Sequence, residues 1–265
     1  MNIRMLGPLE VISDAGATLG LGGRNQRAVF AMLLINRGTL VARDRIIEAV
    51  WGENLPADPA NTLQHYVSRL RSILGPVAGT GASRLIERVD GGYRLTVPAA
   101  WVDADRFHLA LGDATTARRR GSVGEAETLL TGGLDEWRGE PFEDLTYCEF
   151  LQEDIRRLAE NRLDAYEELF DARLALGRHR ESVEELAGLA NRHYLRERFW
   201  QQLMLALYRS GRQAEALRAY QEARRRLGQE LGIDPGPELN MLEERILLAD
   251  PDLQLVETST PLSNP

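Results

Sequence analysis

The segment from Asp58 to Gly75, DPANTLQHYVSRLRSILG, gathers polar side chains that could contact nucleic acid. If it forms a helix, with about 100° between successive residues, these side chains share one side and its edges. They are Asn61, Thr62, Gln64, His65, Ser68, Arg69, Arg71 and Ser72. Amides, hydroxyls, an imidazole and guanidinium groups suit phosphate oxygens and base edges in a DNA major groove. An ordinary amphipathic surface helix would show the same pattern. Only the surrounding elements can distinguish a DNA-binding helix from such a surface helix.

Within this segment we expect different side chains to contact different parts of the DNA. Arg69 would fork onto a guanine or clamp a phosphate, and Arg71 would contact a phosphate. Thr62 would either contact a phosphate or cap the helix locally. The candidates for base edges or bridging waters are Asn61, Gln64, His65 and Ser68. Either arginine could instead be a solvated side chain paired with a neighbouring acid.

Other arginines are expected to contact the DNA backbone. Arg24 and Arg27 start a predicted helix, whose N-terminus suits phosphate. Arg88 and Arg94 flank a predicted hairpin tip and could reach phosphate or the minor groove. Two arginine triplets, 118–120 and 224–226, lie among acids at helix ends. We interpret these triplets as surface charges that suit the helix dipole.

The elements around the polar segment predict a DNA-binding fold. Its apolar stripe recurs every three or four residues: Ala60, Leu63, Val67, Leu70 and Leu74. The neighbouring elements are expected to be strands over 2–6, 9–13 and 18–21, helices over 24–36 and 41–51, a connection over 52–58, and hairpin strands over 84–89 and 93–97. Asp90-Gly91-Gly92 between alternating segments is typical of a hairpin. Strands, three helices and a hairpin predict a winged helix-turn-helix whose third helix enters the groove.

The chain beyond a boundary at 98–103 is predicted to be all helix. Gly177 and Gly211 lie 34 residues apart, each in a helix-to-helix turn, and 34 residues is the tetratricopeptide period. Trp200, at one of the large positions of that repeat, matches Tyr166 at this offset. Ser182 departs from the pattern because alanine is usual there. A generic helical bundle is the alternative.

Charge divides the chain in the same place. Up to Pro98 there are 11 Arg and 8 acidic residues, a net of +3, and the remaining 21 Arg and 32 acidic residues give a net of −11. Such asymmetry suggests that only the first part meets a polyanion.

Cys148 and 4 scattered His show no metal-ligand spacing, so we expect neither a disulfide nor a metal. No nucleophile motif or catalytic carboxylate pair emerges, so we expect no enzymatic activity and no cofactor.

Six motifs occur in an order that identifies a family resemblance. They are LGPLEV at 6–11, GGRNQR…LL at 22–34, RDRIIEAVWG at 43–52, NTLQHYVSRLR at 61–71, DGGYRL at 90–95 and ELGIDPGPEL at 230–239. The first part resembles the winged-helix output domain of OmpR-type response regulators. The whole chain resembles the actinobacterial antibiotic regulatory proteins, the SARP family, almost end to end, and its helical half is similar to their bacterial transcriptional activator domain.

The resemblance implies a fold and three segments. The fold class is an α+β winged helix-turn-helix followed by an all-α tetratricopeptide-like helical domain. The segments are a DNA-binding domain at 1–98, the activator domain at 99–250 and a disordered tail at 251–265. The chain is expected to act in the cytoplasm, because the N-terminus does not fit a signal peptide and no apolar run is long enough to span a membrane.

The resemblance also implies partners. Family members activate genes of secondary metabolism by binding direct repeats in double-stranded DNA near promoters and recruiting RNA polymerase holoenzyme. A second copy could bind the tandem site. The connection GENLPAD would offer Glu53 and Asp58 to polymerase, as the equivalent loop does in OmpR-type domains. Two alternatives stay open: a repressor or ligand sensor that uses the helical half as its sensor, and a repeat scaffold for a protein partner.

Overall fold

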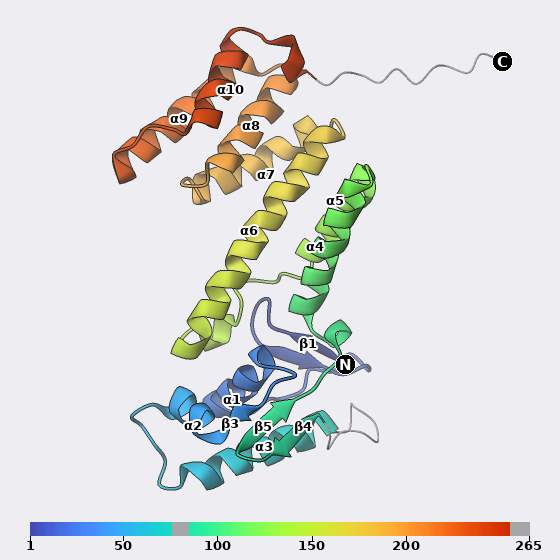
Figure 1. The fold of residues 1–265 in the computed structure, drawn as a ribbon, viewed down its shortest axis with the longest axis vertical. Helices are drawn as coiled ribbons and strands as arrows, with labels where there is room; N and C mark the ends of the chain where they lie inside the picture. The colour runs from blue at the N-terminus through green and yellow to red at the C-terminus, as the bar shows by residue number, and fades with distance from the viewer. Residues whose placement is uncertain (76–84, 255–265) are drawn as a thin grey trace, which may run out of the picture. The chain divides into compact units, whose positions relative to one another are not determined.

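A small antiparallel sheet opens the chain in the computed structural model, which describes residues 1–75 and 85–254 (Figure 1). Strand β1 (Asn2–Arg4) pairs with β2 (Glu10–Ile12), and Ile3 lies opposite Val11. The third strand expected over 18–21 is present only as an isolated bridge between Ile12 and Thr18. Helix α1 (Arg24–Ile35) follows and buries nearly all of its length from Ala28 to Leu34.

A second sheet closes the winged helix-turn-helix. Its strands are β3 (Val41–Ala42), β4 (Ile86–Val89) and β5 (Gly92–Leu95), in the order β3-β5-β4. The helix expected from Val41 therefore begins two residues later, as α2 (Arg43–Trp51). Gly92 has to be glycine, because a Cβ there would lie 2.1 Å from the Val41 carbonyl oxygen. Arg84, at the start of the predicted hairpin, lies outside the described residues.

Helix α3 (Pro59–Leu74) packs its apolar stripe into this domain. Leu63, Val67, Leu70 and Leu74 are buried, as the spacing predicts. Ala60 is exposed, so its assignment to the buried stripe was wrong. It lies in the first turn, before the helix reaches the core. The rings of Trp51 and Tyr66 stack with centroids 5.9 Å apart, which joins the end of α2 to α3.

The rest of the described chain is helical. The helices are α4 (Asp103–Arg119), α5 (Val123–Leu134), α6 (Gln152–Ala175), α7 (His179–Arg192), α8 (Glu197–Arg209), α9 (Gln213–Leu231) and α10 (Pro237–Leu247). Gly177 and Gly211 have φ angles of 79° and 78°, so both repeat turns use the left-handed conformation. Ser182 is fully buried, like its counterpart Ala216, and its hydroxyl donates to the Arg178 carbonyl at 2.8 Å. The tetratricopeptide-like interpretation is thereby confirmed.

The segment after α10 begins with an ordered turn. Pro251–Leu253 forms a short 3-10 turn and Leu253 is buried, so the expected disordered tail is structured at its start. Residues 255–265 of that tail lie outside the described residues. In the described ranges, no helix combines the length and the apolar character that crossing a bilayer requires.

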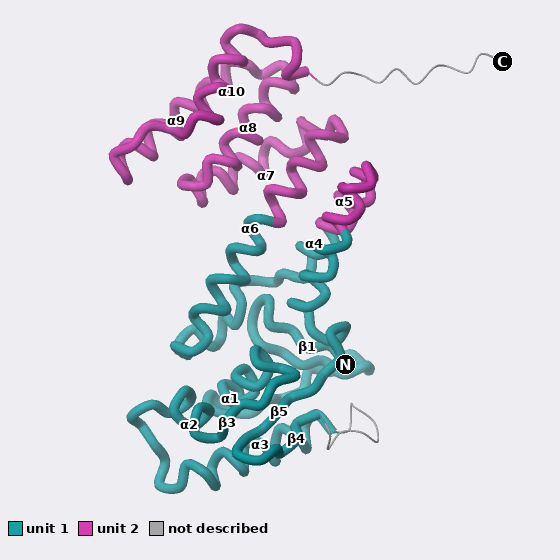
Figure 2. Tube along the Cα trace, viewed as in Figure 1, with its two compact units in different colours: residues 1–113, 131–164 teal, residues 114–130, 165–265 magenta. Residues whose placement is uncertain are grey.

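The chain groups into two compact units that do not follow the predicted boundary (Figure 2). The first contains Met1–Asp113 and Thr131–Asp164, and the second contains Ala114–Leu130 and Ala165–Pro265. The position predicted to separate the two domains, 98–103, thus falls inside the first unit.

Buried polar contacts explain why the first unit crosses that boundary. The carboxylate of Asp103 has no exposed surface and accepts hydrogen bonds from the backbone N–H groups of Met5, Leu6 and Ala104 at 2.8–3.0 Å. The N–H of Phe142 donates to the Met5 carbonyl at 3.0 Å. The segment directly after β1 is therefore held by residues about 100 and 140 positions further along the chain.

Candidate nucleic-acid interface

The polar side of α3 is presented as the spacing predicts. Six of its side chains are exposed: Asn61, Gln64, His65, Ser68, Arg69 and Ser72. Arg69 has no hydrogen-bond or ion-pair partner among the described residues. The alternative in which Arg69 pairs with a neighbouring acid is therefore absent from this structure. An exposed guanidinium without a counter-charge, on a row of amides and hydroxyls, is suited to phosphate or guanine.

The start of α3 is fixed by its own capping contacts. The Asp58 carboxylate accepts from the Asn61 N–H at 2.9 Å, which makes Asp58 the N-cap residue. The Thr62 hydroxyl donates to the Asp58 carbonyl at 2.7 Å. Of the two roles expected for Thr62, the structure displays local capping. Asp58, expected to meet polymerase, thus has a structural role that the sequence interpretation missed, although an Asp before Pro59 is a known start signal.

Arg71 connects α3 to the hairpin. It is half-buried, and its Nε donates to the Ile86 carbonyl at 2.8 Å. Residue 86 opens β4, so this bond fixes the hairpin against the helix. The terminal guanidinium nitrogens have no partner among the described residues, which leaves them for the phosphate contact predicted for Arg71.

The hairpin arginines differ in exposure. Arg88 is exposed and lies opposite Tyr93, whereas Arg94 is half-buried and lies opposite Glu87. Arg88 shares a cleft of about 110 Å³ with Arg43, Gly91, Gly92 and Tyr93. Arg43 was missing from the sequence prediction. It reaches the hairpin because β3 pairs with β5 directly before α2 begins. No local sequence pattern predicts this pairing.

Arg24 and Arg27 do not present free guanidinium groups as predicted. Arg27 forms an ion pair with Asp144, with Nε 2.9 Å from the carboxylate, and also donates to the Leu9 carbonyl at 2.6 Å. The Arg24 guanidinium lies over the Tyr147 ring, 3.4 Å from its centroid. Both partners come from a segment more than 100 residues away. Both arginines thus make contacts within the first unit, and their contact with phosphate stays a prediction.

Several charged and reactive side chains outside this interface make contacts within the protein. Arg118 pairs with Glu168, and Arg225 and Arg226 both bond to Glu222, whose pKa they lower to about 2. Burial raises the pKa of the Cys148 thiol to about 11, which keeps it protonated. In the described ranges no three His, Cys, Asp or Glu side chains are placed to hold a metal ion.

The loop between α2 and α3 offers one acidic and one apolar side chain to solvent. Glu53 is exposed, and Leu55 is 54 % exposed. Glu53 forms no hydrogen bond or ion pair with a described residue. The predicted contact role thus stays available to Glu53, while Asp58 is held at the cap of α3.

Two family models match the chain in succession. Residues 21–95 match "Transcriptional regulatory protein, C terminal", and residues 102–247 match "Bacterial transcriptional activator domain". The first match spans the winged helix-turn-helix, and the second spans most of the helical part.

Individual relatives cover nearly all of the chain. Regulatory protein AfsR of Streptomyces coelicolor is 40% identical over 257 residues, 97% of this chain and 25% of that protein. Transcriptional regulatory protein EmbR of Mycobacterium tuberculosis is 37% identical, over 95% of this chain and 64% of that protein. Regulatory protein DnrI of Streptomyces peucetius is 34% identical, over 96% of this chain and 94% of that protein. The chain thus spans a quarter of AfsR but almost all of DnrI.

A solved structure has the same fold. The structure of Mycobacterium tuberculosis EmbR in complex with a low affinity phosphopeptide superposes with a TM-score of 0.90 at 37% sequence identity. The match covers 94% of this chain and 65% of that chain.

Proposed function

The chain belongs to the SARP family of transcriptional regulators, and from that membership we propose that it is a sequence-specific DNA-binding activator of transcription. The observation that carries the proposal is the exposed polar side of α3, with Arg69 unpaired among the described residues, in a winged helix-turn-helix. The regulated genes would be those of secondary metabolism. The bound site would be a direct repeat near a promoter, with room for a second copy of the chain.

Each side chain of the interface has a role that follows from its surroundings. Arg69 would read a guanine or clamp a phosphate, and Asn61, Gln64, His65 and Ser68 would meet base edges or bridging waters. The free nitrogens of Arg71, together with Arg43 and Arg88 at the hairpin, would contact backbone phosphates. Arg24 and Arg27 are left out of this interface, because Tyr147 and Asp144 already engage them.

Activation would proceed by contact with RNA polymerase. Residues after Pro98 carry a net charge of −11, which DNA would repel and a basic protein surface would attract. The α2–α3 loop is a second candidate surface, since Glu53 is exposed and can meet a basic partner without competing for phosphate. Asp58 would add charge to that surface while it caps α3.

The loop contact is tested by replacing Glu53 without disturbing the cap. Glu53→Arg combined with Asp58→Asn is expected to leave promoter occupancy at the wild-type level and to lower the transcript made by purified polymerase holoenzyme. Asparagine at position 58 removes the charge but can still accept from the Asn61 N–H, whereas arginine could not. One charge reversal in a rim contact should cost about 1 kcal/mol, roughly a fivefold loss.

The controls separate loop contact, binding and repression. Asp58→Asn alone should retain α3 helicity and DNA affinity. Unchanged transcription by the double variant at full occupancy would remove the loop from the mechanism and leave the acidic helical part as the candidate. If the wild-type protein lowers transcription from every promoter it occupies, the chain is a repressor and the activator proposal fails.

A further inference from the structure

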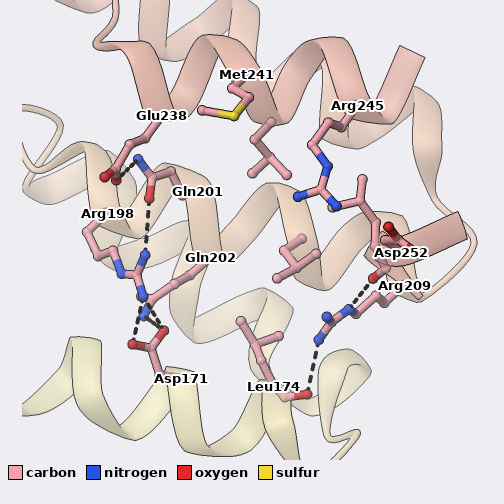
Figure 3. A pocket seen from close by; sticks show the side chains of 13 residues that line it. Asp171, Leu174, Arg198, Gln201, Gln202, Arg209, Glu238, Met241, Arg245 and Asp252 are labelled. Carbon is pink, nitrogen blue, oxygen red and sulfur yellow. Dashed lines mark hydrogen bonds and ion pairs between the residues drawn. The ribbon is translucent and has the colours of Figure 1, made fainter. Parts of the chain in front are cut away.

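The second unit contains a cavity that DNA binding does not explain (Figure 3). It has a volume of about 310 Å³ and lies among α6, α8, α10 and the 3-10 turn at Pro251–Leu253. Its apolar wall is formed by Leu174, Leu205, Met241, Leu242 and Leu253. This volume is at the lower end of the range for small-molecule sites, which combine an apolar wall with a few polar groups.

Three arginines line the cavity, and two of them have acidic partners. Arg198 donates to the Asp171 carboxylate at 2.7 and 2.9 Å. Arg245 donates to the Asp250 carboxylate at 2.6 Å. Their charges are therefore neutralised by the protein itself, and neither needs a further anion.

The third arginine, Arg209, is different. Its Nε donates to the Leu253 carbonyl at 2.7 Å and its Nη1 to the Leu174 carbonyl at 3.2 Å. In the part of the chain that the structure describes, no carboxylate pairs with it. The side chain is only partly exposed, so a positive charge is removed from water with carbonyl dipoles alone to compensate it. Its Nη2 group has no described partner and remains to donate.

Neighbouring groups respond to this charge. Burial lowers the pKa of Arg209, whereas for Arg198 burial also lowers the pKa but the bond to Asp171 and nearby acidic charges outweigh it and raise the pKa overall. The pKa of His179 is lowered first by burial and then by the charge of Arg209. An anion beside Arg209 would therefore relieve an unfavourable charge and not only add a contact.

A second polar group at the cavity is also incompletely bonded. Gln202 is 2% exposed, and its Nε2 donates to the Glu167 carbonyl and the Asp171 carboxylate at 2.7 and 2.8 Å. Its Oε1 is buried and has no hydrogen-bond partner among the described residues. Glu238 and Asp252 also line the cavity, but neither forms a described bond to Arg209, so Arg209 is the lining cation that carbonyl groups alone engage.

We propose that this cavity binds a small organic anion that carries one carboxylate and an apolar body. The carboxylate would bond to the free edge of Arg209, and the apolar body would lie against Leu205, Met241 and Leu242. The site goes beyond the proposed DNA-binding function, and its occupation can be measured without DNA.

The test uses octanoate as the probe and octanamide as its neutral counterpart. Binding is followed by NMR of the full chain labelled with ¹³C at its methionine methyl groups. Met241 lines the cavity and is exposed, whereas Met5 is buried in the first unit and serves as the reference. Octanoate is expected to shift the Met241 signal in a saturable way, and octanamide to bind at least about tenfold more weakly, because it cannot form the charged bond.

Two matched variants isolate the charge of Arg209. Arg209→Gln should weaken octanoate binding by about tenfold or more and leave octanamide binding within about twofold. Arg245→Gln removes a charge from an arginine that already has an acidic partner, and should change octanoate affinity much less. A cavity that collapsed in Arg209→Gln would lose both probes, and Arg209→Lys, which retains the charge, would then have to restore the preference for octanoate.

The proposal is overturned by any of three results. The first is that octanoate and octanamide shift Met241 equally in the wild-type chain. Octanoate could leave Met241 unshifted at millimolar concentration. Arg209→Gln and Arg245→Gln could weaken octanoate to the same extent. Because none of these measurements involves DNA, they are independent of the test of the DNA-binding proposal.

Discussion

Asp103→Ala is expected to lower the free energy of unfolding by about 3–5 kcal/mol, the largest loss we expect from one substitution. The variant leaves the buried N–H groups of Met5, Leu6 and Ala104 without their acceptor. Each buried donor left unsatisfied costs about 1–3 kcal/mol, and local relaxation recovers part of the sum. Equilibrium urea unfolding of the full chain, with the first unit's transition followed separately, measures this loss.

Asp103→Asn is the matched control. It retains one acceptor oxygen, so its loss should be smaller than that of alanine, about 1–3 kcal/mol. Burial raises the pKa of Asp103 above its ordinary value of 3.8, despite the bonds from Leu6 and Met5 that lower it. The folded chain therefore holds this proton to a higher pH than the unfolded chain, so this group's contribution to stability falls as pH rises from 3.8 through the raised pKa.

Asp103→Asn should remove this dependence of stability on pH, because asparagine does not titrate. Wild-type stability should decline across this pH window more steeply than the stability of Asp103→Asn. An alanine variant as stable as wild type would contradict the role assigned to Asp103. Equal losses for alanine and asparagine would mean that the carboxylate oxygens are not the acceptors that matter.

Arg69→Ala is expected to weaken binding to a native promoter by about 1–3 kcal/mol and to relax preference at one base pair. The exposed guanidinium has no partner among the described residues, so its removal should cost little stability. Fluorescence anisotropy with the native site and a panel of single-base substitutions measures both effects. Ser72→Ala, which removes only a hydroxyl bonded to the Ser68 carbonyl, is the control and should bind like wild type.

Arg71 should behave differently from Arg69. Arg71→Ala is expected to weaken all DNA sequences alike and to reduce the slope of log K against log salt by about 1, as the loss of a phosphate contact does. Its Nε also holds the Ile86 carbonyl, so a loss of stability should accompany the loss of affinity. If both arginine variants bind a native promoter as tightly as wild type, the docking of α3 in the groove is wrong.

The sequence predicted the features that depend on short-range periodicity. Leu63, Val67 and Leu70 recur at helical spacing, so the buried side of α3 and its exposed polar side both followed from counting residues. The same holds for the repeat turns at Gly177 and Gly211, where a fixed offset identifies the architecture. Ala60 was misplaced because periodicity says nothing about where the core ends.

The features that were missed depend on partners distant in sequence. Arg27 was assigned to phosphate because nothing near it in the chain reveals Asp144, which lies 117 residues further along. Asp103 had been treated as part of a boundary, yet its carboxylate binds the backbone directly after β1. A charged side chain next to an apolar segment has the same sequence signature whether it faces solvent or a distant backbone. Charge alone therefore could not separate interface arginines from structural ones.

Genome-wide mapping of the sites occupied by the chain in its native host tests the central claim most directly. The account predicts that occupied sites share one recurring sequence, arranged as a direct repeat near promoters, and that Arg69→Ala reduces occupancy at these sites while the Ser72→Ala control does not. Occupancy without a shared sequence, or identical maps for wild type and Arg69→Ala, would contradict sequence-specific binding through α3.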